Sequence, residues 1–320
     1  MKKFFLKLFV FFAPIAILSY SLDVMISNNL RKSNAGENSD WRDIYDGTIN
    51  SDILIYGSSR AWQIIHPQTI SDSLHQNTYN LGIQAHNFWL QYLRHRLLLK
   101  YNKKPKVIIQ SLDFLTFQKR PDLYDPGQFL PYMLFDTLIT KYTTNYKGYT
   151  WFDYTVPLVR YYGQMLFLHR AFSLYTHKIP DPPDRIKGYM AYDMPFTNVF
   201  TDGKLKIKSY HIQFDTATIR LFDKYLLECR ENKIKMIFVY TPEYIAGQRF
   251  VANRDQLFEL IHRFSKIYNI PFYDYSNDTI CYKTAYFYNS EHLNKAGSLL
   301  FSKKFAHDLK LGDMAARSGF

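Results

Sequence analysis

The sequence predicts an α/β fold: a doubly wound parallel sheet with helices on both faces, interrupted by a large, mostly helical insertion rich in aromatic residues. Two observations predict it. Short apolar runs alternate with segments whose apolar residues recur at helical spacing, as in a chain of β-α-β units. This alternation stops between residues 114 and 213, where Tyr, Phe and Pro are frequent. The 320 residues are 47% hydrophobic, which suffices for a core and excludes a disordered, collagen-like or polytopic membrane protein.

The amino terminus has the pattern of a membrane anchor. Three lysines precede an uncharged run over residues 8–22, and the first acidic residue is Asp23. A basic flank stays in the cytoplasm, and residues 4–22 are close to the ~20 apolar residues that a membrane span needs. A cleavable signal peptide is the alternative, but residues 17–20 are bulky where the peptidase requires small side chains. We therefore expect residues 1–25 to anchor the chain in the cytoplasmic membrane, with the main domain outside the cytoplasm.

The remaining chain divides by composition. Residues 26–48 are polar and are expected to form a tether between the anchor and a folded body, with Trp41 and Tyr45 as the candidates to pack onto that body. Residues 49–311 form the expected α/β domain, and residues 312–320 a tail. The insertion over residues 114–213 follows the end of a strand, so it would lie as a cap over the edge where doubly wound sheets bind ligands. Structural padding on the flank of the sheet is the alternative interpretation of this segment.

The expected elements follow in order along the domain. Glycines Gly57 and Gly82 end the first two strands, and lysines and a proline at residues 103–105 separate a helix from the third strand. The expected strands are residues 53–56, 78–81, 107–109, 236–239 and 271–273. The expected helices cover residues 58–74, 86–101, 219–229, 257–268 and 295–309. This order is typical of a flavodoxin-like, three-layer α/β/α arrangement.

The charge and the residue composition argue against several classes of function. Forty Lys and Arg against 28 Asp and Glu leave a net charge of +12, which is spread along the chain. Together with the expected location, this argues against nucleic-acid binding. No glycine-rich phosphate loop is present, so we expect no nucleotide cofactor. Neither the histidines nor the two cysteines show metal-ligand spacing, so we expect no metal. Cys229 and Cys281 are interpreted as two unrelated buried thiols, with a single bridge between them as the alternative.

The first of two polar patches lies where the first strand gives way to a helix. It contains Gly57, Ser58, Ser59 and Arg60 in succession. A hydroxyl at such a turn lies at the carboxyl edge of the sheet, beside free backbone N–H groups and the positive end of a helix dipole. That environment stabilises developing negative charge, as a nucleophilic serine requires. The alternative is a simple helix cap, because Ser is a preferred capping residue.

The second patch, residues 288–297, precedes the last helix and contains Asn289, Glu291 and His292. A histidine there lies in the loop after the final strand. This loop opens onto the same sheet edge as the loop after the first strand, so His292 could reach a hydroxyl of the first patch. Without that partner, a structural role for one of ten histidines would be the simpler interpretation.

Together, the Gly-x-Ser of residues 57–59 and the His-Leu-Asn-x-x-Gly of residues 292–297 resemble the SGNH (GDSL-like) hydrolase superfamily. The resemblance covers nearly the whole chain after residue 50 and is closest to membrane-tethered bacterial members linked to O-acetylation of surface polysaccharides. It implies Ser59 as nucleophile and His292 as general base. It also implies that the backbone N–H groups of Ser59 and Gly82 form an oxyanion hole, with Ser58, Arg60 and Asp113 in the cleft.

The chain departs from the superfamily pattern at three positions. Ser58 stands where an Asp is usual. The oxyanion-donating Asn of the third block is absent from residues 110–113, unless Gln110 or Ser111 replaces it. Losing one such donor typically costs ~10²–10³ in turnover. The third departure is Asn289, which stands in the position of the triad acid. An amide can orient an imidazole but adds no charge. Glu291 is a poor orienter by its position, and Asp274 a more distant one.

Three functions follow as expectations. The first is a membrane-anchored, outward-facing serine esterase or O-acyltransferase that acts on ester groups, acetyl above all, of a cell-surface glycan. The second is a catalytically impaired binding or scaffold subunit of a surface-polysaccharide pathway, whose membrane proteins would be its partners. The third is a lipid esterase. The separation of Ser59 from His292, and the polarity of their surroundings, should distinguish them.

Overall fold

The computed structural model describes residues 1–85, 87–120, 122–144, 146–177, 185–197 and 209–318, with residues 313–318 described by their backbone alone. Its contacts divide the chain into two compact units. The amino-terminal unit comprises residues 1–43 and 121–184, and the α/β unit comprises residues 44–120 and 185–320. The expected insertion is therefore split, and its middle belongs with the amino-terminal segment.

The α/β unit is built on an all-parallel sheet of five strands in the order β2-β1-β3-β4-β5. The strands are β1 (Ile53–Tyr56), β2 (Thr78–Asn80), β3 (Val107–Ser111), β4 (Lys235–Tyr240) and β5 (Phe272–Asp274). All five expected strands are thus present within two residues of the expected bounds. The order reverses between β1 and β3, and this switch point is where such folds bind ligands. The predicted fold class is confirmed.

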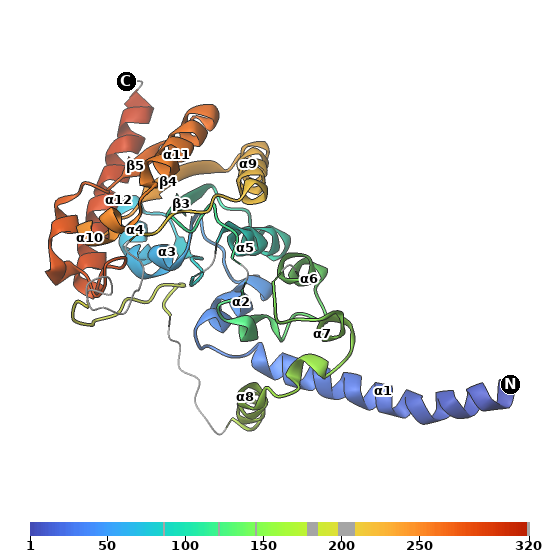
Figure 1. Cartoon of the computed structure of the whole chain (residues 1–320). Helices are drawn as coiled ribbons and strands as arrows, with labels where there is room; N and C mark the ends of the chain where they lie inside the picture. The colour runs from blue at the N-terminus through green and yellow to red at the C-terminus, as the bar shows by residue number, and fades with distance from the viewer. Residues whose placement is uncertain (86, 121, 145, 178–184, 198–208, 319–320) are drawn as a thin grey trace. The chain divides into compact units, whose positions relative to one another are not determined.

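Helices cover both faces of this sheet (Figure 1). One layer contains α3 (Ser59–Ile64), α4 (Pro67–Leu74) and α12 (Lys295–Ser318). The other contains α5 (Phe88–Tyr101), α9 (Thr216–Glu231) and α11 (Arg254–Tyr268). A shorter helix, α10 (Ile245–Phe250), and two 3₁₀ turns, Thr279–Tyr282 and Thr284–Tyr286, complete the unit. The last helix continues through Ser318, into the segment that we expected to be a tail.

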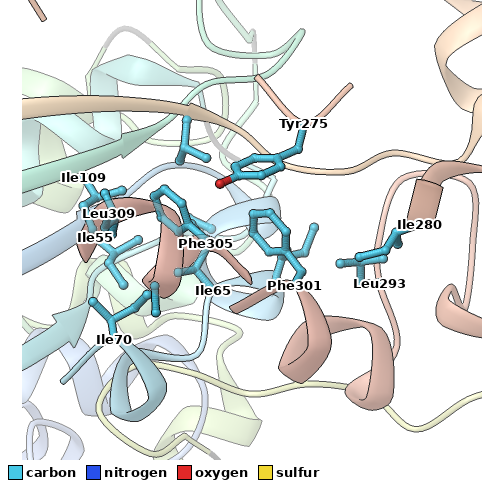
Figure 2. Packing of buried hydrophobic residues seen from close by; sticks show 14 of the residues in the cluster. Ile55, Ile65, Ile70, Ile109, Tyr275, Ile280, Leu293, Phe301, Phe305 and Leu309 are labelled. Atoms are coloured by element: carbon cyan, nitrogen blue, oxygen red, sulfur yellow. The ribbon is translucent and has the colours of Figure 1, made fainter. Parts of the chain in front are cut away.

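The core lies between the sheet and the helices. On one face, aliphatic side chains of β1 and β3 such as Ile55 and Ile109 pack against Phe301, Phe305 and Leu309 of α12 (Figure 2). The other face is aromatic: the ring of Phe222 on α9 lies 4.8 Å from that of Phe88 and 5.2 Å from that of Phe264. Both strand faces are buried, which explains why these strands are continuous apolar runs in the sequence.

The segment after β1 forms two helices instead of the single expected one. Pro67 begins α4, where its missing N–H costs nothing. His66 caps that helix, its Nδ1 accepting the Thr69 N–H at 3.2 Å. The chain therefore turns at residues 65–66, directly after the short α3. His66 thus has a structural role at the start of α4.

The amino-terminal unit begins with α1 (Lys2–Leu30), which is long and apolar enough to cross a membrane. That test rests on length and composition, and a signal sequence would also pass it. The unit adds α6 (Thr137–Thr143), α7 (Trp151–Thr155), α8 (Met165–Thr176) and two 3₁₀ turns, Pro126–Phe129 and Val159–Tyr161. The expected tether is largely helical, because α1 extends to Leu30 and α2 spans Glu37–Tyr45.

Trp41 of α2 is a core residue of the amino-terminal unit. Its side chain is fully buried against Phe129, with ring centroids 5.6 Å apart, and its indole N–H donates to Gln128 Oε1 at 2.8 Å. A helix that buries a tryptophan is not a solvated linker.

Candidate active site

The turn after β1 places Ser59 at the switch point of the sheet. Gly57 ends the strand with a φ of +149°, and a Cβ there would stand 2.8 Å from the Cβ atoms of Ala61 and Ser111. Only glycine fits this approach. Ser58 then caps α3, because its Oγ accepts the Arg60 N–H at 3.2 Å and donates to the Asp113 carboxylate. The capping role thus belongs to Ser58, which leaves the Ser59 hydroxyl for another partner.

That partner is His292. Ser59 Oγ lies 2.7 Å from His292 Nε2, although 233 residues separate them in the chain. His292 lies in the loop between the 3₁₀ turn Thr284–Tyr286 and α12. A bridge between Phe287 and Leu293 closes this loop at its base. The two sequence patches therefore meet at hydrogen-bonding distance, as the nucleophile and base of an acyl-transfer site must.

Asn289 fixes the tautomer of that histidine. Its Oδ1 accepts the backbone N–H groups of Glu291 at 2.9 Å and His292 at 2.8 Å. Backbone N–H groups can only donate, so this atom must be the amide oxygen. The same oxygen lies 3.1 Å from His292 Nδ1, which therefore carries the proton and donates it. Nε2 is left with a lone pair directed at the Ser59 hydroxyl.

The surroundings of His292 keep it neutral. Burial and the positive charge of Arg60 lower the pKa of the imidazole to about 3. A neutral imidazole can accept the Ser59 proton throughout the physiological range. An imidazolium at this position, however, would gain no opposite charge from Asn289. The arrangement is a Ser-His pair with an amide orienter.

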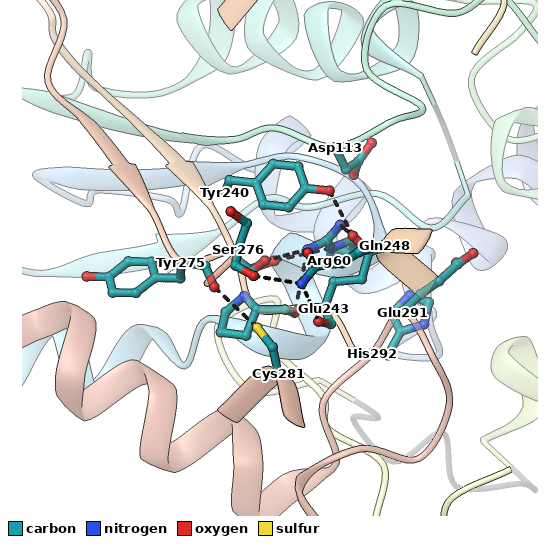
Figure 3. Close-up of polar contacts among 12 residues, drawn as sticks. Arg60, Asp113, Tyr240, Glu243, Gln248, Tyr275, Ser276, Cys281, Glu291 and His292 are labelled. Atoms are coloured by element: carbon teal, nitrogen blue, oxygen red, sulfur yellow. Dashed lines mark hydrogen bonds and ion pairs between the residues drawn. The ribbon is translucent and has the colours of Figure 1, made fainter. Parts of the chain in front are cut away.

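Arg60 is part of a buried polar cluster beside this pair (Figure 3). Its Nη1 lies 3.4 Å from Glu243 Oε2, its Nε donates to Thr241 Oγ1 at 3.2 Å, and its guanidinium stacks on the Tyr240 ring at 4.6 Å. The Tyr240 hydroxyl donates to the same Glu243 carboxylate at 2.8 Å. Both charges of the pair are almost completely buried. The cluster joins the helix after β1 to the loop after β4.

Glu291 belongs to this electrostatic environment but does not orient the imidazole. Burial, with the nearby negative charge of Glu243, raises the pKa of its carboxyl to about 7. Nδ1 of His292 bonds to Asn289, and Asp274 Oδ1 instead accepts the Ser276 N–H at 2.8 Å. Neither carboxyl group replaces the missing triad acid in this arrangement.

The oxyanion donors depart further from the pattern that the resemblance implies. The Gly82 N–H donates to Asn80 Oδ1 at 3.0 Å, so it already has an acceptor. Gln110 points toward the α5 and α9 layer, donating to Gln91 Oε1 at 2.9 Å and accepting from Tyr225 at 3.2 Å. Ser111 remains: its Oγ is buried and finds no hydrogen-bond partner within the described part of the chain.

Aromatic rings that the sequence analysis did not predict lie on the other side of His292. Tyr288 stacks on His292 with centroids 5.5 Å apart, and its hydroxyl donates to Gln63. Tyr192 contacts both Tyr288, at 5.6 Å, and Trp62, at 6.1 Å. Residues 185–197 of the expected cap therefore contact the loop that carries His292. The Gly-Tyr-Met-Ala-Tyr run at 188–192 is the sequence signal for this contact, but nothing in it specifies the partner.

The cavity of about 670 Å³ in the α/β unit is not at this site. It is lined at the amino-terminal ends of the strands by Ile53, Val107 and Lys235, among others, and includes neither Ser59 nor His292. Among the described residues, no group of three or more His, Cys, Asp or Glu side chains could hold a metal ion. The candidate site is the hydrogen-bonded series Ser59–His292–Asn289.

Placing an acid at position 289 tests the role of Asn289 as the hydrogen-bond partner of His292. In Asn289→Asp, a carboxylate oxygen keeps the three hydrogen bonds and adds a negative charge opposite the imidazolium. A hydrogen bond to a charged group is worth ~1.5–3 kcal/mol, so we expect turnover to rise between about 10- and 100-fold. The added charge also raises the His292 pKa from about 3, so the acid limb of kcat/KM moves to higher pH. An unchanged pH profile of ester hydrolysis would contradict the assigned role of Asn289.

Comparisons with known proteins add one observation. No protein-family model and no curated protein matches the chain. Among solved structures, the chain is similar to a Bacteroides fragilis protein described provisionally as an acylhydrolase. The two are 11% identical with a TM-score of 0.33, over 80% of this chain and 86% of that one. At this level of likeness the site geometry, not the neighbour, must carry the functional argument.

Proposed function

We propose that the protein is a membrane-anchored serine ester hydrolase or O-acyltransferase, with Ser59 as nucleophile and His292 as general base. The observation that carries the proposal is the 2.7 Å contact between Ser59 Oγ and His292 Nε2, with His292 Nδ1 held 3.1 Å from an amide oxygen. This contact supplies a nucleophile, a base in the required tautomer and an orienting group.

The reaction proceeds in two halves. Ser59 Oγ attacks the acyl carbon of an ester while His292 Nε2 takes its proton. The tetrahedral intermediate then collapses, the alkoxide leaves with that proton, and an acyl ester of Ser59 remains. In the second half, His292 deprotonates water or a sugar hydroxyl, which attacks the acyl group and regenerates Ser59. Water gives hydrolysis, and a hydroxyl gives transfer.

The proposed substrate is an O-acetylated glycan outside the cytoplasm. The glycan and the acetyl group come from the sequence resemblance, and the outward location from the basic flank of the apolar helix. The charged side chains of Arg60, Asp113 and Glu291, which lie near the Ser-His pair, support a sugar over a lipid substrate. A lipid acyl chain would require an apolar cleft at the same place.

Two observations favour a second function, a binding or scaffold subunit of a polysaccharide pathway. The triad acid is replaced by Asn289, and the Gly82 N–H is engaged by Asn80. Each change removes stabilisation of charge in the transition state. In this alternative the fold and the Ser-His contact persist without useful turnover.

Release of acetate separates these functions. The full chain, purified in detergent, is assayed with p-nitrophenyl acetate and with an O-acetylated oligosaccharide, beside Ser59→Ala. Ser73→Ala, a change on α4 outside the site, is the matched control. We expect turnover in the wild type and in Ser73→Ala but not in Ser59→Ala. Acetylation of added oligosaccharide would identify a transferase. Equal rates of acetate release in wild type and Ser59→Ala would contradict the esterase proposal and favour the binding or scaffold function.

A further inference from the structure

We propose that the amino-terminal unit contacts the membrane at a second place, with the surface formed by α7, α8 and the turn between them resting in the lipid headgroup region. This inference goes beyond the catalytic proposal and rests on α1 being a membrane anchor. The surface, called here the α7–α8 surface, consists of Trp151, Tyr162, Met165, Leu166, Phe172 and Tyr175.

These side chains are unusually exposed for their type. Tyr162 is 91% exposed, Leu166 78% and Met165 71%. On α8, Met165, His169 and Phe172 recur at helical spacing on one stripe, and His169 is its polar member. Ala171 and Ser173 are the buried residues of that helix. Phe167, Leu168 and Leu174 are half-buried on the packed side of the helix, whereas Met165, Leu166 and Phe172 are left open to solvent. So many exposed large apolar side chains are unusual for a helix of a water-soluble domain.

Buried polar contacts tie this segment to α1. Arg160, in the turn before α8, forms a bidentate ion pair with Asp23 at 2.6 and 2.7 Å. The hydroxyls of Tyr161 and Ser27 lie 2.8 Å apart, and α8 itself packs against α1. The ion pair is fully buried. The position of the α7–α8 surface along α1 is therefore fixed by contacts within one unit.

That position is the level at which α1 leaves the hydrocarbon. Residues 4–22 rise about 28 Å at 1.5 Å per residue, close to the ~30 Å hydrocarbon core of a bilayer. Asp23, the first charged residue after this run, lies at the end of the apolar segment. Because Arg160 is paired with Asp23, Tyr162 and the start of α8 lie at the membrane–water boundary.

The chemistry of the surface fits this boundary better than it fits a protein partner. Trp and Tyr, with an apolar ring and one polar group, are the side chains that concentrate at membrane interfaces. A helix with one apolar face lies in the interface plane with that face toward the acyl chains. The α7–α8 surface adjoins α1 at the depth where α1 leaves the hydrocarbon. We therefore infer that lipid covers this surface.

Spin labels placed one at a time in the full chain test the proposal. Leu166→Cys and Phe172→Cys are labelled with a nitroxide in vesicles of phosphatidylcholine and phosphatidylglycerol. The native Cys229 and Cys281 are buried, so they do not compete under native conditions. Ile267→Cys, an exposed apolar position on α11 of the α/β unit, is the matched control. Val10→Cys reports on α1 itself.

We expect the labels at 166 and 172 to be relaxed more by oxygen than by a water-soluble nickel complex, and the label at 267 to show the opposite order. If 166 and 172 behave like 267 while Val10→Cys reports lipid, the anchor stands and the proposal is wrong. If both reagents are excluded at 166 and 172, a protein covers the surface, and the proposal is equally wrong. If the label at Val10→Cys is relaxed more by the nickel complex than by oxygen, α1 is not in the membrane and the premise of the proposal is wrong. None of these readings depends on ester turnover, so a failure of the catalytic proposal is separately detectable.

Discussion

His292→Ala is expected to lower turnover of an acetyl ester by about 10²–10⁴-fold with little change in KM. The Ser59 hydroxyl has a high pKa and becomes nucleophilic only when a base removes its proton. In serine proteases, losing the base costs up to about 10⁶, but an intact triad supplies part of that advantage through its acid. Asn289 provides no charge here, so His292 accelerates the reaction less than the histidine of an intact triad does. Removing His292 should therefore lower the rate by a smaller factor.

The measurement is kcat and KM of the full chain in detergent, with circular dichroism to confirm that the variant folds. His307→Ala, an exposed position on α12, is the control. Full activity in His292→Ala would show that some other group activates the serine. The account would also fail if both histidine variants lost activity equally, since His307 has no contact with the site.

Arg60→Met is expected to give the largest loss of stability. The substitution leaves the Glu243 carboxylate buried without its cation, and breaking a buried pair in this way costs ~3–5 kcal/mol. The loss follows from burial: both side chains of the pair are at most 2% exposed. It also removes the charge that depresses the His292 pKa, so the acid limb of residual activity should move to higher pH.

Thermal unfolding of the full chain measures this effect. Arg220→Met, at an exposed position on α9, should melt close to the wild type. The double variant Arg60→Met/Glu243→Gln should recover most of the loss, because a neutral amide can still accept the Tyr240 hydroxyl. If Arg60→Met melts like Arg220→Met, the pair does not hold the loop after β4 against α3.

The sequence predicted the parts of the molecule that depend on local pattern. Gly57 and Gly82 follow the first two strands, and β1 is a short, continuous apolar run because both of its faces are buried. The closeness of Ser59 and His292 was predicted because parallel strands bring the loops at their carboxyl ends to one edge. These inferences need the order of elements but no knowledge of side-chain packing.

The parts that were missed depend on contacts between distant segments. Arg60 and Glu243 are 183 residues apart, and no spacing rule pairs them. Nothing in the sequence indicated that Asn80 would take the Gly82 N–H. The sequence named Trp41 as a residue of the tether that could pack onto the folded body, but nothing in it identified Phe129, in the insertion, as the partner. The composition of a segment does not show which distant residues it will pack against.

The central claim is that Ser59 is an activated nucleophile despite the amide at position 289. The most direct measurement is labelling of the full chain with a fluorophosphonate probe, followed by mapping of the modified peptide. The account predicts modification at Ser59 in the wild type and in Ser73→Ala, and its loss in His292→Ala. Absence of modification in folded wild-type protein, together with p-nitrophenyl acetate turnover no faster than that of Ser59→Ala, would contradict it.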